Sequence, residues 1–196
     1  MLNQFLRDPV ANSIAVITLI FMLASVIWVT IRFIDGDPNK AKTWPSWVIP
    51  VLSLFGLVIA IYLTFIESTQ SEAFCGPVGD CNSVQQSQYA KIFGFFPVGL
   101  LGGLGYLAIL ILSMIQNRLL VEKRKFYSLS IWGLAWFGVL FSIYLTFLEP
   151  FVIGATCMWC ITSAFTITFI FLASTPPAIH AMHSSDDVPF EELVEE

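Results

Sequence analysis

Residues 61–67 read IYLTFIE, and residues 143–149 read IYLTFLE. Six of the seven positions are identical, and a cysteine follows the final Glu of each stretch by eight residues, at Cys75 and Cys157. A shared IYLTF pentapeptide with the same offset to a cysteine is a poor fit to chance similarity between apolar stretches. The chain therefore reads as two tandem units, each of which delivers a cysteine pair.

The rest of the chain has the composition of a membrane protein. Of its 196 residues, 57% are hydrophobic and 12% are charged, and the mean hydropathy is +0.79. The charged share is about half of that in a soluble domain, which excludes soluble and disordered proteins. A membrane helix needs about 20 mostly apolar residues. Five segments meet or approach this length: Val10–Ile34, Trp47–Ile66, Val98–Ile115, Ser130–Leu148 and Cys157–Ser174.

Lys and Arg in the short loops set the expected orientation of these spans. Arg7 and Lys91 lie on one side of the membrane and seven basic residues lie on the other: Arg32, Lys40, Lys42, Arg118, Lys123, Arg124 and Lys125. We therefore expect a multi-pass protein of the inner (plasma) membrane with its N-terminus outside and its C-terminus in the cytoplasm. All four cysteines then face the oxidising side. We interpret Glu67 and Glu149 as helix ends at that interface rather than as catalytic groups.

The acidic balance of the chain belongs to its last residues. The chain has nine Lys and Arg against 14 Asp and Glu, and six of the acids follow His183. No basic patch of the kind that binds nucleic acid is present in the sequence.

The cysteines form two pairs of different character. Residues 157–160 read CMWC at a predicted helix start, where free N–H groups and the helix dipole lower the thiol pKa. Three residues of helix place Cys160 about 4.5 Å deeper than Cys157. Residues 75–81 read CGPVGDC, a turn-rich loop that can carry a disulfide to and from the fixed pair. Two dithiol pairs, one mobile and one fixed, would make an electron relay.

Other uses of these residues stay open at this point. The four cysteines could hold zinc or form two structural disulfides, although a C-x-x-C bridge closes too small a loop to stabilise much. A transporter or metal-handling protein could use them as soft ligands, but the predicted spans lack the mid-membrane ionisable groups typical of transporters. His180 and His183 are too few for a metal site, and we interpret them as surface residues.

Further motifs give a family resemblance. The loop pair is followed by CNSVQQSQYA at 81–90, FG at 93–94 and PVG at 97–99, and the C-x-x-C pair comes last. The chain resembles the vitamin K epoxide reductase family in its bacterial membrane form, over roughly Trp47 to Ser174. DsbB-type quinone-linked oxidases have the reverse cysteine order.

The resemblance implies a fold and a division into segments. Residues 1–46 would hold an additional helix and its loop. Residues 47–175 would form a four-helix bundle around a quinone, ubiquinone or menaquinone, with the cysteine loop at 69–97. Residues 176–196 would be the acidic tail. The sequence shows no haem-ligand pattern and no dinucleotide fingerprint, which also favours a quinone as acceptor.

The resemblance also implies roles for single residues. Cys160 would lie beside the quinone, Cys157 would exchange with Cys75, and Cys81 would form the mixed disulfide with a separate thioredoxin-like (DsbA-type) protein. Spacing agrees with this, because Cys81 lies six residues further from the helix end than Cys75, along a Gly/Pro turn. Ser87 matches a family serine on a short helix that covers the bundle mouth.

Apolar residues at roughly helical spacing predict that helix over Asn82–Phe96. The predicted activity is thus a quinone-dependent membrane oxidoreductase that supports disulfide formation in exported proteins.

Overall fold

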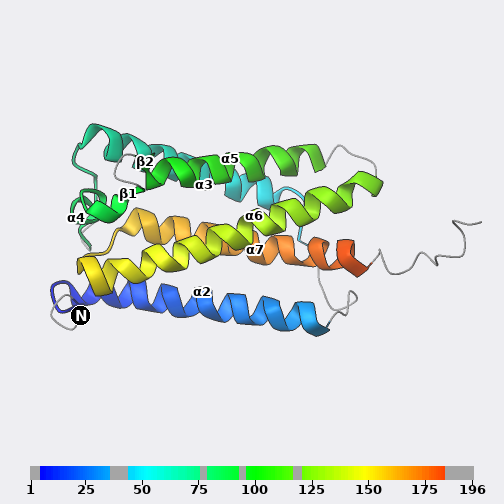
Figure 1. The fold of residues 1–196 in the computed structure, drawn as a ribbon, viewed down its shortest axis with the longest axis horizontal. Coiled ribbons are helices and arrows are strands. Elements are labelled where there is room, and N and C mark those ends of the chain that lie inside the picture. Colours follow the sequence, from blue (N-terminus) through cyan, green and yellow to red (C-terminus); the bar gives the residue numbers. More distant parts are fainter. Residues whose placement is uncertain (1–4, 36–43, 76–78, 93–95, 117–120, 184–196) are drawn as a thin grey trace, which may run out of the picture.

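The computed structural model describes residues 5–35, 44–75, 79–92, 96–116 and 121–183. Five long helices run along its long axis (Figure 1): α2 (Pro9–Asp35), α3 (Val48–Thr69), α5 (Val98–Gln116), α6 (Val121–Leu148) and α7 (Met158–His183). All five are long and apolar enough to cross a membrane. The predicted all-α fold with five spans is therefore confirmed.

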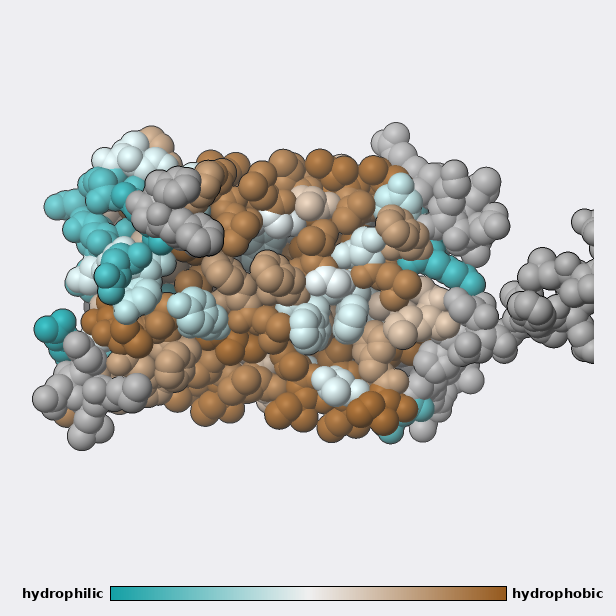
Figure 2. Space-filling view, viewed as in Figure 1, coloured by the Kyte–Doolittle hydropathy of each residue, from teal (hydrophilic) through white to brown (hydrophobic). Residues whose placement is uncertain are grey.

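An apolar belt surrounds the middle of the molecule. Figure 2 shows hydrophobic side chains across the centre of one face and hydrophilic side chains near its ends. Within the belt Ile17 is 65% exposed, Val58 59% and Phe65 60%. Side chains of this size gather on an outer surface when that surface faces lipid, where helices satisfy their own backbone groups. The chain is a multi-pass membrane protein.

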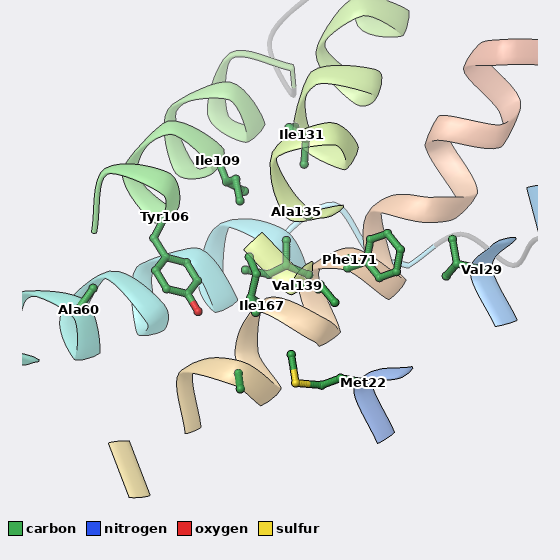
Figure 3. Close-up of a cluster of buried hydrophobic side chains, with 12 residues drawn as sticks. Met22, Val29, Ala60, Tyr106, Ile109, Ile131, Ala135, Val139, Ile167 and Phe171 are labelled. Carbon is green, nitrogen blue, oxygen red and sulfur yellow. The ribbon is translucent and has the colours of Figure 1, made fainter. Parts of the chain in front are cut away.

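The core lies where α5, α6 and α7 meet α3. Phe171, Ile109 and Val139 are at most 1% exposed and point into this space (Figure 3). Helix α2 adds Met22 and Val29 to the same core. The additional helix is therefore packed into the bundle and is not a separate anchor beside it.

Helix α7 is longer than predicted. The sequence places its end at Ser174, before two prolines, but the helix continues through Pro176 and Pro177 to His183. Proline removes a backbone hydrogen bond, yet membrane helices tolerate it where neighbouring elements pack against the turn. Ala178 is 0% exposed and Ile179 3%, so packing holds this part of the chain in the helix.

Short elements gather at one end of the bundle, which we name the cysteine end (Figure 1). They are α4 (Cys81–Gln85), the 3₁₀ turn η2 (Gln88–Ala90), the antiparallel strands β1 (Lys91–Ile92) and β2 (Phe96–Pro97), and the π-helical turn η3 (Glu149–Ile153). Turn η3 continues α6 and closes where the Gly154 N–H donates to the Glu149 carbonyl at 2.8 Å. Such π-turns are frequent at functional sites.

The helix predicted over Asn82–Phe96 ends at Gln85, and the described residues after it form η2, β1 and the start of β2, while 93–95 lie outside the described residues. Asp80 caps α4, since its carboxylate accepts from the Ser83 N–H at 3.0 Å. The Ser87 hydroxyl then donates to the Val84 carbonyl at 2.7 Å, and the Ser87 backbone is extended. Side-chain bonds of this kind compete with helix continuation, so the chain turns through η2 into β1.

Candidate active site

The first cysteine pair forms a disulfide. Cys75 is bonded to Cys81, with their Cα atoms 5.9 Å apart, and the Cys81 N–H donates to the Cys75 sulfur at 3.0 Å. Cys81 is the first residue of α4. The side-chain oxygen of the next residue, Asn82, accepts from the Ala73 N–H at 2.7 Å and holds the two ends of the loop together.

The second pair consists of two free thiols at the mouth of the bundle. Cys157 is fully buried just before α7, and Cys160 is half-buried one turn inside that helix. The predicted position of this pair at a helix start is confirmed. The Gln85 side-chain amide donates to both sulfurs, each at 3.6 Å. Helix α4 thus covers the second pair while carrying half of the first.

Hydrogen bonds dock the disulfide loop on the start of α7. The Asp80 N–H donates to the Thr156 carbonyl at 3.1 Å, and the Trp159 indole N–H donates to the Phe74 carbonyl at 2.9 Å. The Phe74 N–H donates in turn to the Tyr62 hydroxyl at 2.9 Å, and the Tyr62 and Trp159 rings lie 4.9 Å apart. The two cysteine pairs are therefore held side by side by contacts of residues next to them in sequence.

The two loop sulfurs differ in exposure, in the opposite sense to the prediction. Cys81 is 0% exposed and packs in one buried cluster with Val84 and Cys157, whereas Cys75 is half-buried. The expectation that Cys81 reaches outward is wrong, and both loop cysteines pack against the cluster that holds Cys157. The reason is α4, which turns Cys81 inward on the same helix face as Gln85, four residues later.

Both glutamates of the sequence repeat are buried. Glu67 is 3% exposed and Glu149 2%. Glu67 accepts from the Gly99 N–H at 2.9 Å, and Glu149 accepts from the Cys157 N–H at 3.4 Å. They lie near helix ends as predicted, but they do not face the interface. The sequence repeat could have indicated that both glutamates belong to the site, since an ionisable residue stands at matching positions in two apolar spans.

A small cavity of about 40 Å³ opens beside Cys160. Its polar lining brings together the predicted Ser87 and Cys160 with Gln85 and both repeat glutamates. The Gln85 side-chain oxygen is buried and has no hydrogen-bond partner among the described residues. The remaining lining residues are Val84, Tyr89, Ala90, Val98, Leu145, Leu148 and Ile153. The cavity thus joins a thiol to several hydrogen-bonding groups.

The surroundings of the site lower the pKa values of two groups that lie outside the membrane-spanning helices, Cys157 and Asp80. The hydrogen bond from the Cys160 thiol holds the pKa of Cys157 below its ordinary value, against the opposing effect of burial. Hydrogen bonds from the Ser83 side chain and backbone lower the pKa of the Asp80 carboxyl. A lowered thiol pKa raises the fraction of thiolate, the attacking species in disulfide exchange.

Residues 47–175 match the sequence model of the Vitamin K epoxide reductase family. The chain belongs to this family. The match takes in α3 to α6 and most of α7, and it contains both cysteine pairs, whereas α2 lies outside it. Membership of the vitamin K epoxide reductase family makes the protein a membrane oxidoreductase of the disulfide-handling kind.

The family membership and the geometry also bear on the alternatives. The Cys75–Cys81 disulfide does not supply the thiolates that a four-cysteine zinc site needs. His180 is exposed on the part of α7 far from Cys160, and the side chain of His183 lies outside the described residues. A larger cavity of about 420 Å³ borders His180, Arg124 and Trp44 at the opposite end of the bundle and has no cysteine in its lining.

Proposed function

We propose that the protein reoxidises a separate thioredoxin-like (DsbA-type) protein and passes the electrons to a quinone, so that exported proteins acquire disulfides. The docking of the loop disulfide on the C-x-x-C pair is the observation that carries this proposal. Sulfurs held side by side in this way can move electrons from a dissolved dithiol into the bundle by thiol–disulfide exchange alone.

Electrons enter the relay at Cys75, because it is the loop sulfur that a partner can reach. A partner thiolate attacks the Cys75 sulfur and Cys81 leaves as a thiolate. The partner's second thiol then attacks the mixed disulfide, so the partner leaves oxidised and the loop holds two thiols. This assignment reverses the roles that spacing predicted, and it is supported by the difference in exposure between the two sulfurs.

The buried side of the loop passes the electrons on. The Cys81 thiolate attacks Cys157 of an oxidised Cys157–Cys160 pair, and Cys75 then attacks Cys81 to close the loop disulfide again. The products are a loop disulfide and two free thiols at Cys157 and Cys160. This is the combination of oxidation states described above, one step before the acceptor is reduced.

The chemistry of the cavity beside Cys160 fits a quinone head group. A bound quinone supplies an acceptor for two electrons and two protons at its carbonyl oxygens. The Tyr89 hydroxyl would donate to a quinone carbonyl oxygen, and Ser87 lines the same space. The unpartnered Gln85 side-chain oxygen can only accept, so it would bind a hydroxyl of the reduced quinone. The cavity must widen to admit a quinone ring. Its volume of about 40 Å³ is close to the volume per molecule in liquid water, about 30 Å³.

The repeat glutamates supply the route for protons. Oxidation of Cys157 and Cys160 to a disulfide releases two electrons and two protons. Glu149 and Glu67 both line the cavity that Cys160 borders. We infer that they pass the thiol protons to the acceptor oxygens as general acid–base groups.

The cysteine end is proposed to face the outside of the plasma membrane. The seven basic loop residues of the opposite side support this orientation, against Arg7 and Lys91 at the cysteine end. Only that side is oxidising enough to keep the loop disulfide.

Quinone reduction by the purified protein tests the proposed function. Reduced thioredoxin-like protein is mixed with the enzyme and with ubiquinone or menaquinone, and quinone absorbance is followed. We expect turnover with at least one of them and none with Cys160→Ser. Absence of turnover with both quinones would refute the quinone-linked reaction.

A trapping experiment tests the roles of the loop sulfurs. A partner whose resolving cysteine is changed to Ala carries its remaining cysteine as a mixed disulfide with thionitrobenzoate, and it is mixed with each single loop variant. The free loop thiolate attacks the partner sulfur and thionitrobenzoate leaves. A stable mixed disulfide should form with Cys81→Ser, in which Cys75 is present to hold it, and should not form with Cys75→Ser. The reverse pattern would restore the assignment that spacing predicted.

A further inference from the structure

We propose that α2, which lies outside the family match, is part of the redox centre: its Asn12 is a positioning residue that holds Thr156 and through it the approach of the loop disulfide to Cys157. The proposal rests on the proposed exchange between the two cysteine pairs. It does not depend on the identity of the final electron acceptor.

The contact itself is a buried side-chain hydrogen bond between helix and active site. The Thr156 hydroxyl donates to the Asn12 side-chain oxygen at 2.9 Å, and both residues are 0% exposed. The Asn12 amide nitrogen donates to the Phe5 carbonyl at 2.9 Å. A carbonyl can only accept, so this second bond fixes which end of the Asn12 amide faces Thr156.

Thr156 is the residue on which three parts of the molecule meet. Its hydroxyl contacts α2, its carbonyl accepts the Asp80 N–H of the disulfide loop at 3.1 Å, and its chain continues directly into Cys157. A rotation of this residue would therefore change the distance between the loop and Cys157. The bond to Asn12 fixes that rotation from the outside of the four-helix bundle.

The other buried polar side chains of α2 form hydrogen bonds within their own helix. The Thr18 hydroxyl donates to the Ile14 carbonyl at 2.9 Å, and the Ser25 hydroxyl donates to the Phe21 carbonyl at 2.8 Å, both within the helix. Such bonds satisfy the hydroxyl without linking α2 to another element. Asn12 differs from them because its partner belongs to the active site.

Helix α2 has packing contacts besides this hydrogen bond. It runs along α6 and α7 and begins at the cysteine end (Figure 1). Phe21 packs against Phe165 with ring centroids 5.5 Å apart, and Met22 and Val29 belong to the core. A substitution at Asn12 should therefore leave the packing of α2 intact while it removes the bonds to Thr156 and to Phe5. Thr156→Val leaves the Asn12–Phe5 bond in place and so isolates the effect on Thr156.

The test uses Asn12→Leu and Thr156→Val in the full chain. Thr156→Val keeps the side-chain shape and removes only the hydroxyl. Two variants serve as controls. Thr18→Val removes a buried hydroxyl from α2, the helix of Asn12, at a position away from the site. Thr156→Ser keeps the hydroxyl that bonds to Asn12. Rapid mixing with reduced thioredoxin-like protein, followed by alkylation and mass spectrometry, separates reduction of the loop from transfer to Cys157 and Cys160.

We expect Asn12→Leu and Thr156→Val each to slow the transfer step about tenfold, the effect of leaving a buried group without its partner. Reduction of the loop should be unchanged, as should both steps in Thr18→Val and Thr156→Ser. The double variant should be no slower than either single one, because both remove the same bond.

Three results would overturn the inference: wild-type transfer in Asn12→Leu, an equal loss in Thr18→Val, or losses that multiply in the double variant. A variant that fails to fold is replaced by Asn12→Ser, for which the same slowing of transfer is expected. If wild-type protein shows no transfer between its cysteine pairs, the proposed function itself fails, and this outcome is distinct from the three above.

Discussion

Substitution of Gly79 by Ala should undock the disulfide loop. Gly79 has a φ of +90°, and a Cβ added there would lie 2.5 Å from the Thr156 carbonyl oxygen. A left-handed conformation costs a residue with a side chain about 1–2 kcal/mol. Displacing the carbonyl also weakens its bond from the Asp80 N–H, 3.1 Å long, which is worth about 1 kcal/mol. The docked loop should therefore lose about 2–3 kcal/mol relative to the undocked one.

A loss of this size has a kinetic consequence. Since about 1.4 kcal/mol corresponds to a factor of ten, transfer from the loop thiols to the C-x-x-C pair should slow by about 30-fold to 140-fold. Rapid mixing with reduced partner, alkylation and mass spectrometry measure that step directly. Reduction of Cys75 by the partner should remain fast, since it does not require docking.

The matched control is Gly102→Ala in α5. A Cβ at Gly102 meets no atom within 4 Å, and Ala is the better helix former. Gly102→Ala should transfer electrons at the wild-type rate. The reasoning is refuted if Gly79→Ala also transfers at that rate, or if Gly102→Ala is slowed as much.

Three further outcomes are expected. Glu149→Gln should slow quinone reduction about 100-fold, as loss of a general acid–base group does, and Glu67→Gln should slow it to a lesser extent; quinone absorbance measures both, and unchanged rates would remove the glutamates from the proton route. The Cys157 thiol should ionise at a lower pH than a free thiol, because a hydrogen bond from Cys160 lowers its pKa. As the pH falls, the thiolate absorbance of Cys157 should therefore persist to a lower pH than that of a free thiol. Cys160→Ala removes this hydrogen bond and should raise the pH at which the thiolate absorbance is lost. A reporter fused after Glu196 should be active only if it functions in the cytoplasm, and activity of an exported reporter there would reverse the orientation.

Local sequence patterns predicted most of the fold. Apolar length located all five spans, and the C-x-x-C spacing placed Cys157 and Cys160 at a helix start, because both features depend on neighbours along the chain. The end of α7 was missed at Pro176 because packing against other helices keeps the chain helical there. A single sequence carries no direct information on such long-range contacts.

The same distinction explains what was missed in the site. Cys81 turns inward because Asp80 and Ser87 fix the ends of α4, and the spacing of the loop cysteines does not encode this. Glu67 and Glu149 were visible as a repeated pair, but their burial depends on neighbours such as Gly99. Asn12 looked like any polar residue near a helix start until Thr156, 144 positions away, was placed beside it.

The unequal exposure of the loop disulfide would restrict which thiols can react with the proposed relay. Of the two loop cysteines, Cys75 is half-buried and Cys81 is fully buried, and Cys157 is fully buried just before α7. Exchange requires an in-line approach to a sulfur. A small thiol in the medium should therefore attack the loop disulfide at Cys75 and not at Cys81. In the proposed reaction, burial would thus limit unwanted reduction by small thiols and leave Cys75 as the loop sulfur that a partner protein engages.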